Sequence, residues 1–563
     1  MNASLVAVAG LIIYFLGYRF YARYLAEKIY KLNPDAPVPS HTMQDGVDYV
    51  PTNKYVLFGH HFASISGAAP IVGPALAVIW GWVPAFLWVV FGAVLMGCVH
   101  DFSALIISVR SRARSIGEIS KDMIGARAMT AYMVIMFFVL TLVLAVFLLI
   151  IAGLLIEYPE VVFPVFSLMV IAVGIGLLIY RTDIGLRPAS IAGIILMIAA
   201  IWWGSEHPYP LPETTMFGSA KSTWIFLLAI YSFVASVLPV WLLLQPRDYL
   251  ESFKLYAGLG LLYAGIIITG PTIVAPAIRP DVSGAPPIWP FLFITIACGA
   301  LSGFHSIVSS GTSSKQIDNE KDAVFVGYGG MIGESLLGLT AVIACTAGFQ
   351  SSGAWFKHYA SWTSASGLGA KLTAFVDGSA FFISSLGVPV QIGKTFIALI
   401  IVAFAMTTLD SACRLGRYIV AEFGAEQKIP VLTNRYVGSG IIAGPAFVLT
   451  MGTYGGTPAG LLLWPLFGTT NQLLASLVFA TVTIYLLKRK AKTWFVGIPL
   501  VLVAITTIYA MIWNIISYVR TGNWILTVIG SSILVAGFFL ILLACGSYML
   551  QKKELRAESG GAG

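Results

Sequence analysis

Several side chains that bind or transfer protons stand within or beside strongly apolar segments of this sequence. They are His61, His100, Asp101, His305 and Glu334. Ionisable groups are costly to bury in a membrane and are therefore candidates for binding an ion or a substrate. Histidine also changes its charge near neutral pH. The pattern predicts a site that couples to a cation. For His100 and Asp101, near one end of their segment, a cap at the interface is an equal alternative to a proton relay.

Two short stretches share the pattern G-x-H-x-x-x-x-S-G and predict two halves of one binding site. They are GHHFASISG, Gly59–Gly67, and GFHSIVSSG, Gly303–Gly311. Inverted repeats with helices interrupted by Gly and Pro are usual in secondary transporters, whose substrate lies near the membrane midplane. Close helix packing through small residues is the alternative. The residues that we expect at the substrate are His61, Ser64, Ser66, Gly67, Ala68, His305, Ser309, Ser310 and Gly311.

Proline and glycine predict an interrupted helix in the first of these stretches. Pro70 lacks a backbone N–H and frees a carbonyl one turn back, and Gly67 lowers helix propensity. Loosened backbone persists in a membrane only where protein buries it or where it lines a wet cavity. We therefore expect a break near Ser66–Pro70 that faces a counterpart near Ser309–Thr312 across the centre of the protein.

Two further segments place polar groups at depth. AFAMTTLDSACRLGRYI holds Asp410 and Arg414, whose i, i+4 spacing predicts an ion pair on one helix face. Its adjacent threonines suit a cation site, although threonine also bonds back to its own helix. LLWPLFGTTNQLLASL holds Asn471 and Gln472, which either line the substrate path or make interhelical hydrogen bonds. The candidates for coupling to a cation are Glu334, Thr407, Thr408, Asp410, His100 and Asp101.

Composition predicts an all-α polytopic membrane protein. Of 563 residues, 58% are hydrophobic and 10% are charged, against about 25% charged in soluble proteins. Apolar runs recur that are long enough to cross about 30 Å of hydrocarbon. We predict about 15 transmembrane helices, an inverted-repeat core with broken helices plus additional helices. The spans are 4–18, 57–80, 83–109, 129–154, 161–180, 186–204, 223–245, 255–278, 288–310, 324–347, 395–412, 436–452, 459–486, 494–517 and 524–548.

Charge in the loops predicts the orientation. The most basic short loops, 110–127 and 488–492, belong on the cytoplasmic side by the positive-inside tendency. The N-terminus is then outside and the C-terminus inside, provided that 372–392 does not cross. We treat 1–563 as a single membrane domain, with 549–563 as a short polar cytoplasmic tail that we expect to be disordered.

The same composition excludes several classes of function. The net charge is +8, but the basic residues lie in short loops, where they set the orientation in the membrane. This charge therefore does not indicate a nucleic-acid partner. The histidines and the five cysteines lack the spacing of metal ligands, so we predict no metal and no other cofactor. No catalytic motif or soluble catalytic domain is present, which argues against an enzyme.

Four stretches closely resemble the carbon starvation protein A family of bacterial inner-membrane transporters. They are PTNKYVLFGHHFASISGAAPIVGPALA, QPRDYLESF, FAMTTLDSACRLGRYI and LLWPLFGTTNQLLA, and the resemblance runs over nearly the whole chain. It implies uptake of peptides or pyruvate during carbon starvation, coupled to protons in some members, and a location in the inner membrane. It also implies a distant relation to transporters of the five-plus-five inverted-repeat type. One departure concerns Gly67-Ala68-Ala69-Pro70, where relatives are expected to have Gly-Ala-Gly-Pro.

We therefore expect a secondary transporter that imports pyruvate or short peptides with a proton or sodium gradient. The alternative is an ion channel or metal permease that uses the intramembrane histidines. A coupling proton would reside on His61, His305 or Glu334, and a sodium ion would need Thr407, Thr408 and carbonyls of the broken helix.

Overall fold

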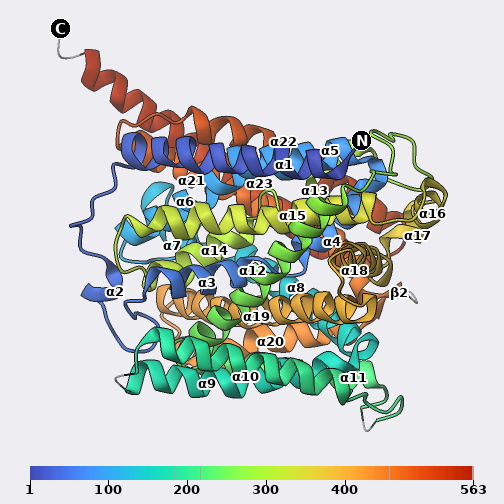
Figure 1. Ribbon diagram of the computed structural model, residues 1–563. Helices are drawn as coiled ribbons and strands as arrows, with labels where there is room; N and C mark the ends of the chain where they lie inside the picture. Colours follow the sequence, from blue (N-terminus) through green and yellow to red (C-terminus); the bar gives the residue numbers. More distant parts are fainter. Residues whose placement is uncertain (183, 216, 455–456, 561–563) are drawn as a thin grey trace.

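The computed structural model describes residues 1–182, 184–215, 217–454 and 457–560, and nearly all of them are helical (Figure 1). The first part of the chain forms α1, Ala3–Leu16; η1, Gly17–Ala22; η2, Leu25–Tyr30; α2, Pro39–Thr42; α3, Lys54–Ile65; α4, Ala69–Ala77; η3, Val78–Trp80; α5, Trp82–Leu87; η4, Trp88–Gly97; α6, Cys98–Arg110; α7, Ile116–Met123; and α8, Ala126–Glu157.

The remaining elements follow in chain order. They are η5, Pro159–Val161; α9, Val162–Arg181; α10, Leu186–Glu206; α11, Ala220–Val237; α12, Leu244–Thr269; α13, Ile288–Thr295; α14, Gly303–Gly311; η6, Ser313–Lys315; η7, Val324–Tyr328; α15, Gly329–Ala347; α16, Ser352–His358; α17, Trp362–Ser366; α18, Leu368–Ser384; α19, Val390–Glu426; η8, Pro430–Thr433; α20, Arg435–Met451; β1, Thr453–Tyr454; β2, Thr457–Pro458; α21, Ala459–Lys488; α22, Trp494–Arg520; and α23, Trp524–Gly560. β1 and β2 form a short antiparallel pair.

Twelve helices in the described part of the chain are long and apolar enough to span a membrane, and a bent pair raises the number to 13. The prediction of a polytopic helical protein is therefore confirmed, whereas the count of about 15 is not. The two remaining predicted spans differ in form. Residues 288–310 divide into α13 and α14, and 436–452 corresponds to α20, which has 17 residues.

Two helices are interrupted at the centre of the bundle. α3 ends at Ile65, and α4 starts at Ala69 after a bend of 46°. α13 ends at Thr295, and α14 starts at Gly303. Between them, Gly299 adopts a φ of +91°, which glycine tolerates because it lacks a Cβ.

The first break is where the sequence predicts it, but the second is at 296–302 and not at Ser309–Thr312. Ser309 and Ser310 belong to α14, and Thr312 is its C-terminal cap. The helix is continuous through both serines, and the Ser310 hydroxyl donates to the Ser306 carbonyl within it (2.7 Å). The first histidine motif thus ends at the centre of the protein, whereas the second begins there.

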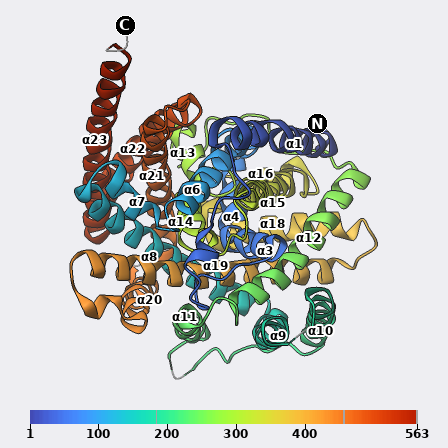
Figure 2. The ribbon, with the colours of Figure 1, turned by 90° about the vertical axis from the view of Figure 1, so that its left-hand side faces the viewer.

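The helix that follows each break packs on a helix from the other part of the chain. α4 packs on α15 while α14 packs on α6, and the long helices α8 and α19 pack against each other. Figure 2 shows α9, α10 and α11 as a peripheral layer below this core, with α22 and α23 on another side. The interrupted helices are therefore enclosed by protein, as exposed backbone in a membrane requires.

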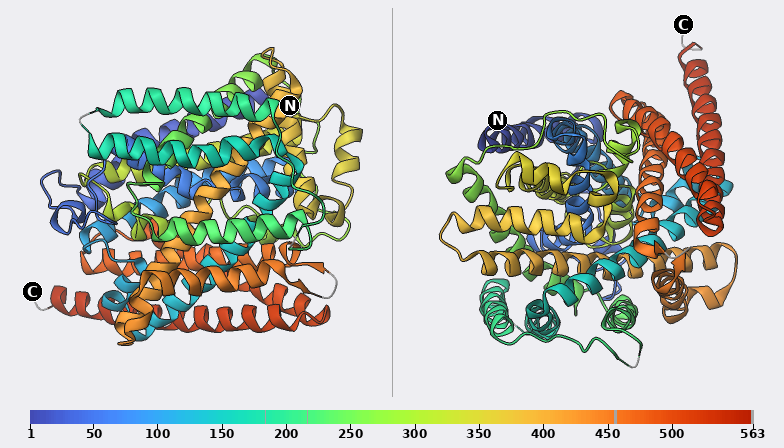
Figure 3. Two further views of the ribbon diagram at one scale, coloured as in Figure 1. Left: turned by 90° about the horizontal axis from the view of Figure 1, so that it is seen from below. Right: turned by 90° about the vertical axis from the view of Figure 1, so that its right-hand side faces the viewer.

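The two ends of the bundle differ. One end, which we call the basic end, carries the loops 110–127 and 488–493 and the C-terminal end of α23. The opposite end carries the N-terminus, α16 and α17. α18 lies across the spans, nearly end-on in Figure 1 and running over this opposite end in the right panel of Figure 3, so 372–384 does not run parallel to the spans.

The C-terminal tail differs from its prediction. α23 continues through 549–560, so this part of the tail is helical and not disordered. Residues 561–563 lie outside the described residues.

Candidate functional site

The two breaks meet at the centre of the bundle. A Cβ placed on Gly299 would lie 3.4 Å from Cβ of Pro70, and one on Gly73 would lie 2.4 Å from the carbonyl oxygen of Thr295. The two interrupted helices therefore face each other as predicted, with the corrected position for the second. Buried polar side chains from α3, α6, α14, α15 and α21 surround this point.

Asp101, His305 and Glu334 form a buried chain beside the second break. His305 Nδ1 lies 2.8 Å from Asp101 Oδ2, and His100 Nδ1 lies 2.8 Å from the other Asp101 oxygen. His305 Nε2 lies 3.2 Å from Glu334 Oε2, within ion-pair distance but without the alignment of a hydrogen bond. An imidazole between two fully buried carboxylates is an arrangement that holds a proton well and changes charge when it leaves.

Asn471 and Gln472 bind the second break to α21. Asn471 Oδ1 accepts from the backbone N–H of Phe304 (2.8 Å), and its amide donates to Ser302 Oγ (3.0 Å). The Gln472 amide donates to the carbonyls of Phe293 and Leu301. These are the interhelical hydrogen bonds that the sequence allows as an alternative, and they satisfy the backbone that the interruption of the helix exposes.

Three donors near this point could hold a metal ion. The donor atoms of Cys298, His305 and Glu334 lie within 4.8 Å of one another, and all three residues are buried. This is a set that sequence spacing does not reveal, because the three residues come from the second break, α14 and α15. The prediction of no metal stays untested.

His61 and His60 lie on α3 in different surroundings. His61 Nδ1 is 2.8 Å from Ser313 Oγ, and its Nε2 is buried without a hydrogen-bond partner among the described residues. His60 Nδ1 is 2.6 Å from Asp248 Oδ2, and its Nε2 faces Thr312 Oγ1 at 3.3 Å. His60 thus belongs to an ionic network on α12, and His61 has the freer ring nitrogen.

The first break contacts α19 and α8 through its carbonyls and its glycine. Thr408 Oγ1 donates to the carbonyl of Ser64 (3.1 Å), whose hydroxyl lies 2.8 Å from that of Ser411. A Cβ on Gly67 would lie 2.7 Å from Thr408 Oγ1 and 2.5 Å from the ring of Phe147. Hydroxyl and carbonyl oxygens therefore gather here, as a hard cation prefers. Thr407, by contrast, donates back to Ala403 of its own helix.

Other predicted substrate residues divide between the centre and the periphery of this site. The Ser66 and Ser309 hydroxyls are buried without hydrogen-bond partners among the described residues, and Ala68 is fully buried at the start of α4. Ser310 Oγ accepts from the backbone N–H of Ile116 on α7, and Gly311 packs on Leu415, so both lie toward the basic end.

The predicted pair of Asp410 and Arg414 is wrong. Asp410 pairs with Arg247 of α12 and accepts from the Tyr231 hydroxyl (2.5 Å). Arg414 instead reaches Asp48 (3.1 Å) and the carbonyl of Ala235 (2.9 Å). Partners from neighbouring helices offer each buried charge several hydrogen bonds, more than the modest gain of an i, i+4 pair. Because Arg247 neutralises Asp410, this carboxylate is a weaker candidate for coupling than the sequence indicates.

A small cavity at the opposite end contains a lysine that the sequence analysis does not single out. The cavity has a volume of about 130 Å³ and includes Lys371, Trp464, Val146 and Leu149 in its lining. Lys371 is only 5% exposed, and its ammonium group lies 5.2 Å from the centre of the Trp464 ring. Burial lowers the pKa of its ammonium group to about 7. Leu76, near the end of α4, also lines the cavity, which therefore lies beside the outer part of the first broken helix.

A charged cluster closes the basic end, where the segment 31–53 meets α19. Asp48 lies 3.1 Å from Arg414 and 3.5 Å from Arg417, and it accepts from the Tyr418 hydroxyl (2.5 Å). Burial alone would raise the pKa of Asp48, but Arg414, Arg417 and Lys315 outweigh it and hold the pKa below its usual value. Burial lowers the pKa of Lys315, whose ammonium lies 3.7 Å from the centre of the Tyr418 ring.

Replacing Asp48 with asparagine should destabilise the protein by about 1–3 kcal/mol at neutral pH, because the substitution leaves buried cations without a counter-charge. The carboxylate contributes stability above its unfolded pKa, and that contribution is lost as pH falls through the lower folded pKa. Thermal unfolding of the purified protein should show the largest difference from wild type near pH 7 and a smaller one toward about pH 3. A difference that grows in acid would contradict this assignment.

Two facing broken helices, an enclosed polar centre and a cavity beside it define a helical membrane transporter. A manganese transporter of Eremococcus coleocola has the same fold, with a TM-score of 0.52 and 12% identity over 90% of this chain and 99% of that one. The chain belongs to the carbon starvation protein CstA family, whose model matches residues 2–367 and 360–510.

Curated relatives match most of the chain. The peptide transporter CstA of Bacillus subtilis is 33% identical over 99% of both chains. The pyruvate/proton symporter BtsT of Escherichia coli is 35% identical over 91% of this chain and 81% of that protein. The resemblance that the four sequence stretches indicate is confirmed.

Proposed function

We propose that this protein is a proton-coupled secondary transporter that imports a small carboxylate, pyruvate or a short peptide, across the bacterial inner membrane. Transport rather than catalysis is the activity proposed. The observation that carries it is His305 between the carboxylates of Asp101 and Glu334 at the meeting point of the two breaks. The names of the relatives, a peptide transporter and a pyruvate/proton symporter, support the same substrate classes.

In this proposal, the buried chain of Asp101, His305 and Glu334 carries the coupling proton. The chain has a net charge of −1 with an imidazolium and −2 with a neutral imidazole. Because extra charge is costly in a buried site, each change of protonation favours a different arrangement of α6, α14 and α15 around the breaks. The substrate carboxylate would meet the N-terminal end of α4, where the helix dipole favours an anion. Backbone N–H groups contribute little there, because Pro70 has none and those of Ile71 and Val72 donate to the Ala68 carbonyl.

The orientation that we propose has the basic end in the cytoplasm and the N-terminus outside. Basic residues concentrate in the loops 110–127 and 488–492, and this supports the assignment. The cavity at Lys371 then opens toward the outside, and the cluster around Asp48 closes the inside.

The direct test is uptake of radiolabelled pyruvate and dipeptides into proteoliposomes, with proton and sodium gradients imposed separately. We expect accumulation that requires the proton gradient and collapses with a protonophore. Accumulation that follows only the sodium gradient, and that Thr408→Val abolishes, would move coupling to the oxygens around Ser64. Uptake of neither substrate under any gradient would overturn the proposal.

A metal permease is the second candidate, and the donor group of Cys298, His305 and Glu334 is the observation that favours it. The same proteoliposomes distinguish the two candidates. Flux of a divalent metal that Cys298→Ser abolishes, without accumulation of pyruvate or dipeptide, would support the permease.

Lys371 should contribute affinity for the carboxylate of a substrate that occupies the outer cavity before it reaches the start of α4. The exchange Lys371→Gln should weaken binding about tenfold or more, since a charge-assisted hydrogen bond contributes about 1.5–3 kcal/mol. Because the pKa of Lys371 is about 7, binding to wild type should weaken as pH rises through neutrality, and the variant should lack this change. Burial is the cause of this lower pKa, and no neighbouring charge contributes to it.

Equilibrium binding to the detergent-purified protein checks this prediction without an imposed gradient. Lys357→Gln, an exposed lysine on α16, is the matched control and should bind like wild type. The amide analogue of the substrate should bind both variants equally. Equal loss of carboxylate and amide binding in Lys371→Gln would contradict a role for the charge.

A further inference from the structure

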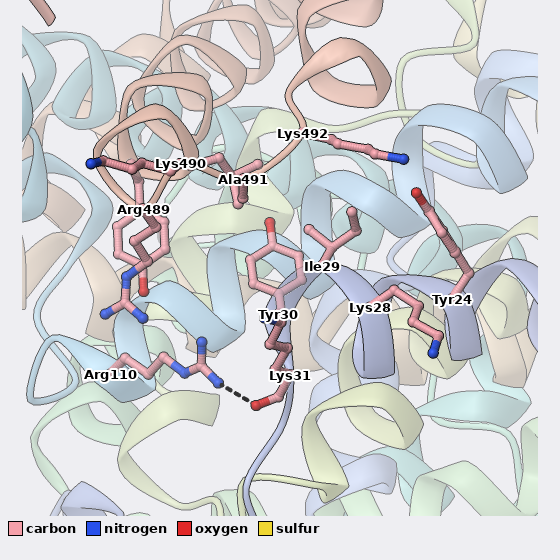
Figure 4. A pocket seen from close by; sticks show the side chains of 12 residues that line it. Tyr24, Lys28, Ile29, Tyr30, Lys31, Arg110, Arg489, Lys490, Ala491 and Lys492 are labelled. Atoms are coloured by element: carbon pink, nitrogen blue, oxygen red, sulfur yellow. Dashed lines mark hydrogen bonds between the residues drawn. The ribbon is translucent and has the colours of Figure 1, made fainter. Parts of the chain in front are cut away.

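A large basic pocket lies at the basic end, far along the bundle from the two breaks. It has a volume of about 900 Å³ (Figure 4). Three elements form it: η2 with its cap Lys31, the end of α6, and the link from α21 to α22. Its cationic lining residues are Lys28, Lys31, Arg110, Arg489, Lys490 and Lys492, and none of the twelve described residues that line it is acidic.

The cations of this pocket exceed the carboxylates that could neutralise them. Arg110 pairs with Glu320 (2.5 Å), and the nearby Glu27 pairs with Arg23. Lys28, Lys31, Arg489 and Lys492 have no ion pair with any described carboxylate. Arg489 lies over the ring of Tyr485, 4.7 Å from its centre. Gathered like charges repel one another, and a bound anion would relieve this repulsion.

The position of the pocket indicates which anion it takes. Tyr30 and Arg110 end candidate spans, and Lys492 precedes another by two residues, so the pocket lies at the depth of lipid headgroups. Farther along the same spans many exposed side chains are apolar, including Phe20 at 62%, Trp494 at 56% and Ile498 at 57%, while Arg19 and Arg23 of the first span are exposed cations. A lipid can therefore place its headgroup in the pocket and keep its acyl chains in hydrocarbon.

We propose that this pocket binds the phosphate headgroup of an anionic phospholipid. Basic pockets between spanning helices, on the side of the positive loops, are suited to phosphate headgroups by charge and depth. Tyr24 supplies an amphipathic ring that favours this interface, whereas Tyr30 is buried and its hydroxyl donates to Ser103 (2.7 Å). The volume accommodates a headgroup with two phosphates as well as one with a single phosphate. The proposal concerns a site separate from the transport path and does not depend on the proposed substrate.

Native mass spectrometry of the full chain in detergent tests the proposal, with cardiolipin, phosphatidylglycerol or phosphatidylcholine added at equal concentration. Wild type should retain the two anionic lipids in preference to phosphatidylcholine. The triple variant Lys28→Gln, Arg489→Gln and Lys492→Gln should lose this preference about tenfold or more. The matched control, Arg127→Gln, Lys321→Gln and Arg435→Gln, removes three exposed cations outside the pocket and should behave like wild type.

Two further arms keep the result decisive. The exchange Lys28→Arg, Arg489→Lys and Lys492→Arg keeps the charge and should keep lipid binding, even if the glutamine variant does not fold. In wild type, the anionic preference should weaken as salt rises from about 0.05 M to about 0.5 M. An unchanged preference in the glutamine variant would overturn the proposal, and so would displacement of the lipid by an equal concentration of inorganic phosphate, which would indicate a soluble ligand.

Discussion

Gradient-driven uptake will fall to the level of empty proteoliposomes when Glu334 is replaced by glutamine. The reason is the position of this carboxylate, 3.2 Å from His305 and fully buried. A neutral amide keeps the shape but removes one of the two charges that hold the proton on His305. The group then has a net charge of 0 with an imidazolium and −1 with a neutral imidazole, instead of −1 and −2. The buried charge that makes substrate binding require a proton is thus reduced, and coupling is lost.

The measurement separates coupling from folding. Glu334→Gln should still exchange labelled for unlabelled substrate when both sides of the membrane contain it, because exchange needs no net proton movement. Thr408→Val, on α19 beside the first break, is the matched control and should keep its dependence on the proton gradient. Accumulation by Glu334→Gln at the wild-type level would exclude this carboxylate from coupling and leave His61 as the remaining candidate on α3.

Replacing Arg247 with alanine should destabilise the protein by about 3–5 kcal/mol, the usual cost of breaking a buried ion pair. Arg247 is 2% exposed and pairs with both Asp410 and Asp248 (2.7 Å for the latter). Its removal leaves Asp410 without a counter-charge in the interior. The expected loss of stability should appear as a lower midpoint of thermal unfolding in detergent, together with a lower yield of monodisperse protein.

Two variants test the cause of that loss. The double exchange Arg247→Met with Asp410→Leu removes both charges and should recover part of the stability, while His60 remains beside Asp248. Arg23→Ala breaks an exposed pair with Glu27 and should cost less than about 1 kcal/mol. A double variant less stable than Arg247→Ala alone would show that packing, not charge, dominates at this point.

Long apolar runs and the glycine–proline pattern made the helical class, the first break and the buried polar residues predictable. The second break was not, because the stretch from Ala297 to Ser302 contains no proline and its turn depends on the positive φ of Gly299. The partner of Asp410 was also not predictable, because Arg247 is distant in sequence. Spacing along one helix predicts contacts within that helix, whereas tertiary packing also offers each charge partners from neighbouring helices.

Lys371 and Asp48 could not be identified as functional candidates from the sequence for a related reason. Lys371 carries a signal, a single lysine before an apolar stretch, but its cavity depends on the way that α18 crosses the bundle. Asp48 stands in a polar segment where a carboxylate is ordinary, and only the structure brings it to Arg414 and Arg417.

The contact between Asp48 of segment 31–53 and Arg414 of α19 bears on the turnover rate and on the leakage of ions across the membrane. This segment leads directly into α3. In the proposed transport cycle, α3 would therefore move away from α19 only after Asp48 releases Arg414. Each 1.4 kcal/mol held in that contact slows opening about tenfold. In that proposal, a weaker contact would speed each cycle but would leave the basic end open more often without substrate. Turnover and the conservation of the ion gradient would thus be opposed through one carboxylate.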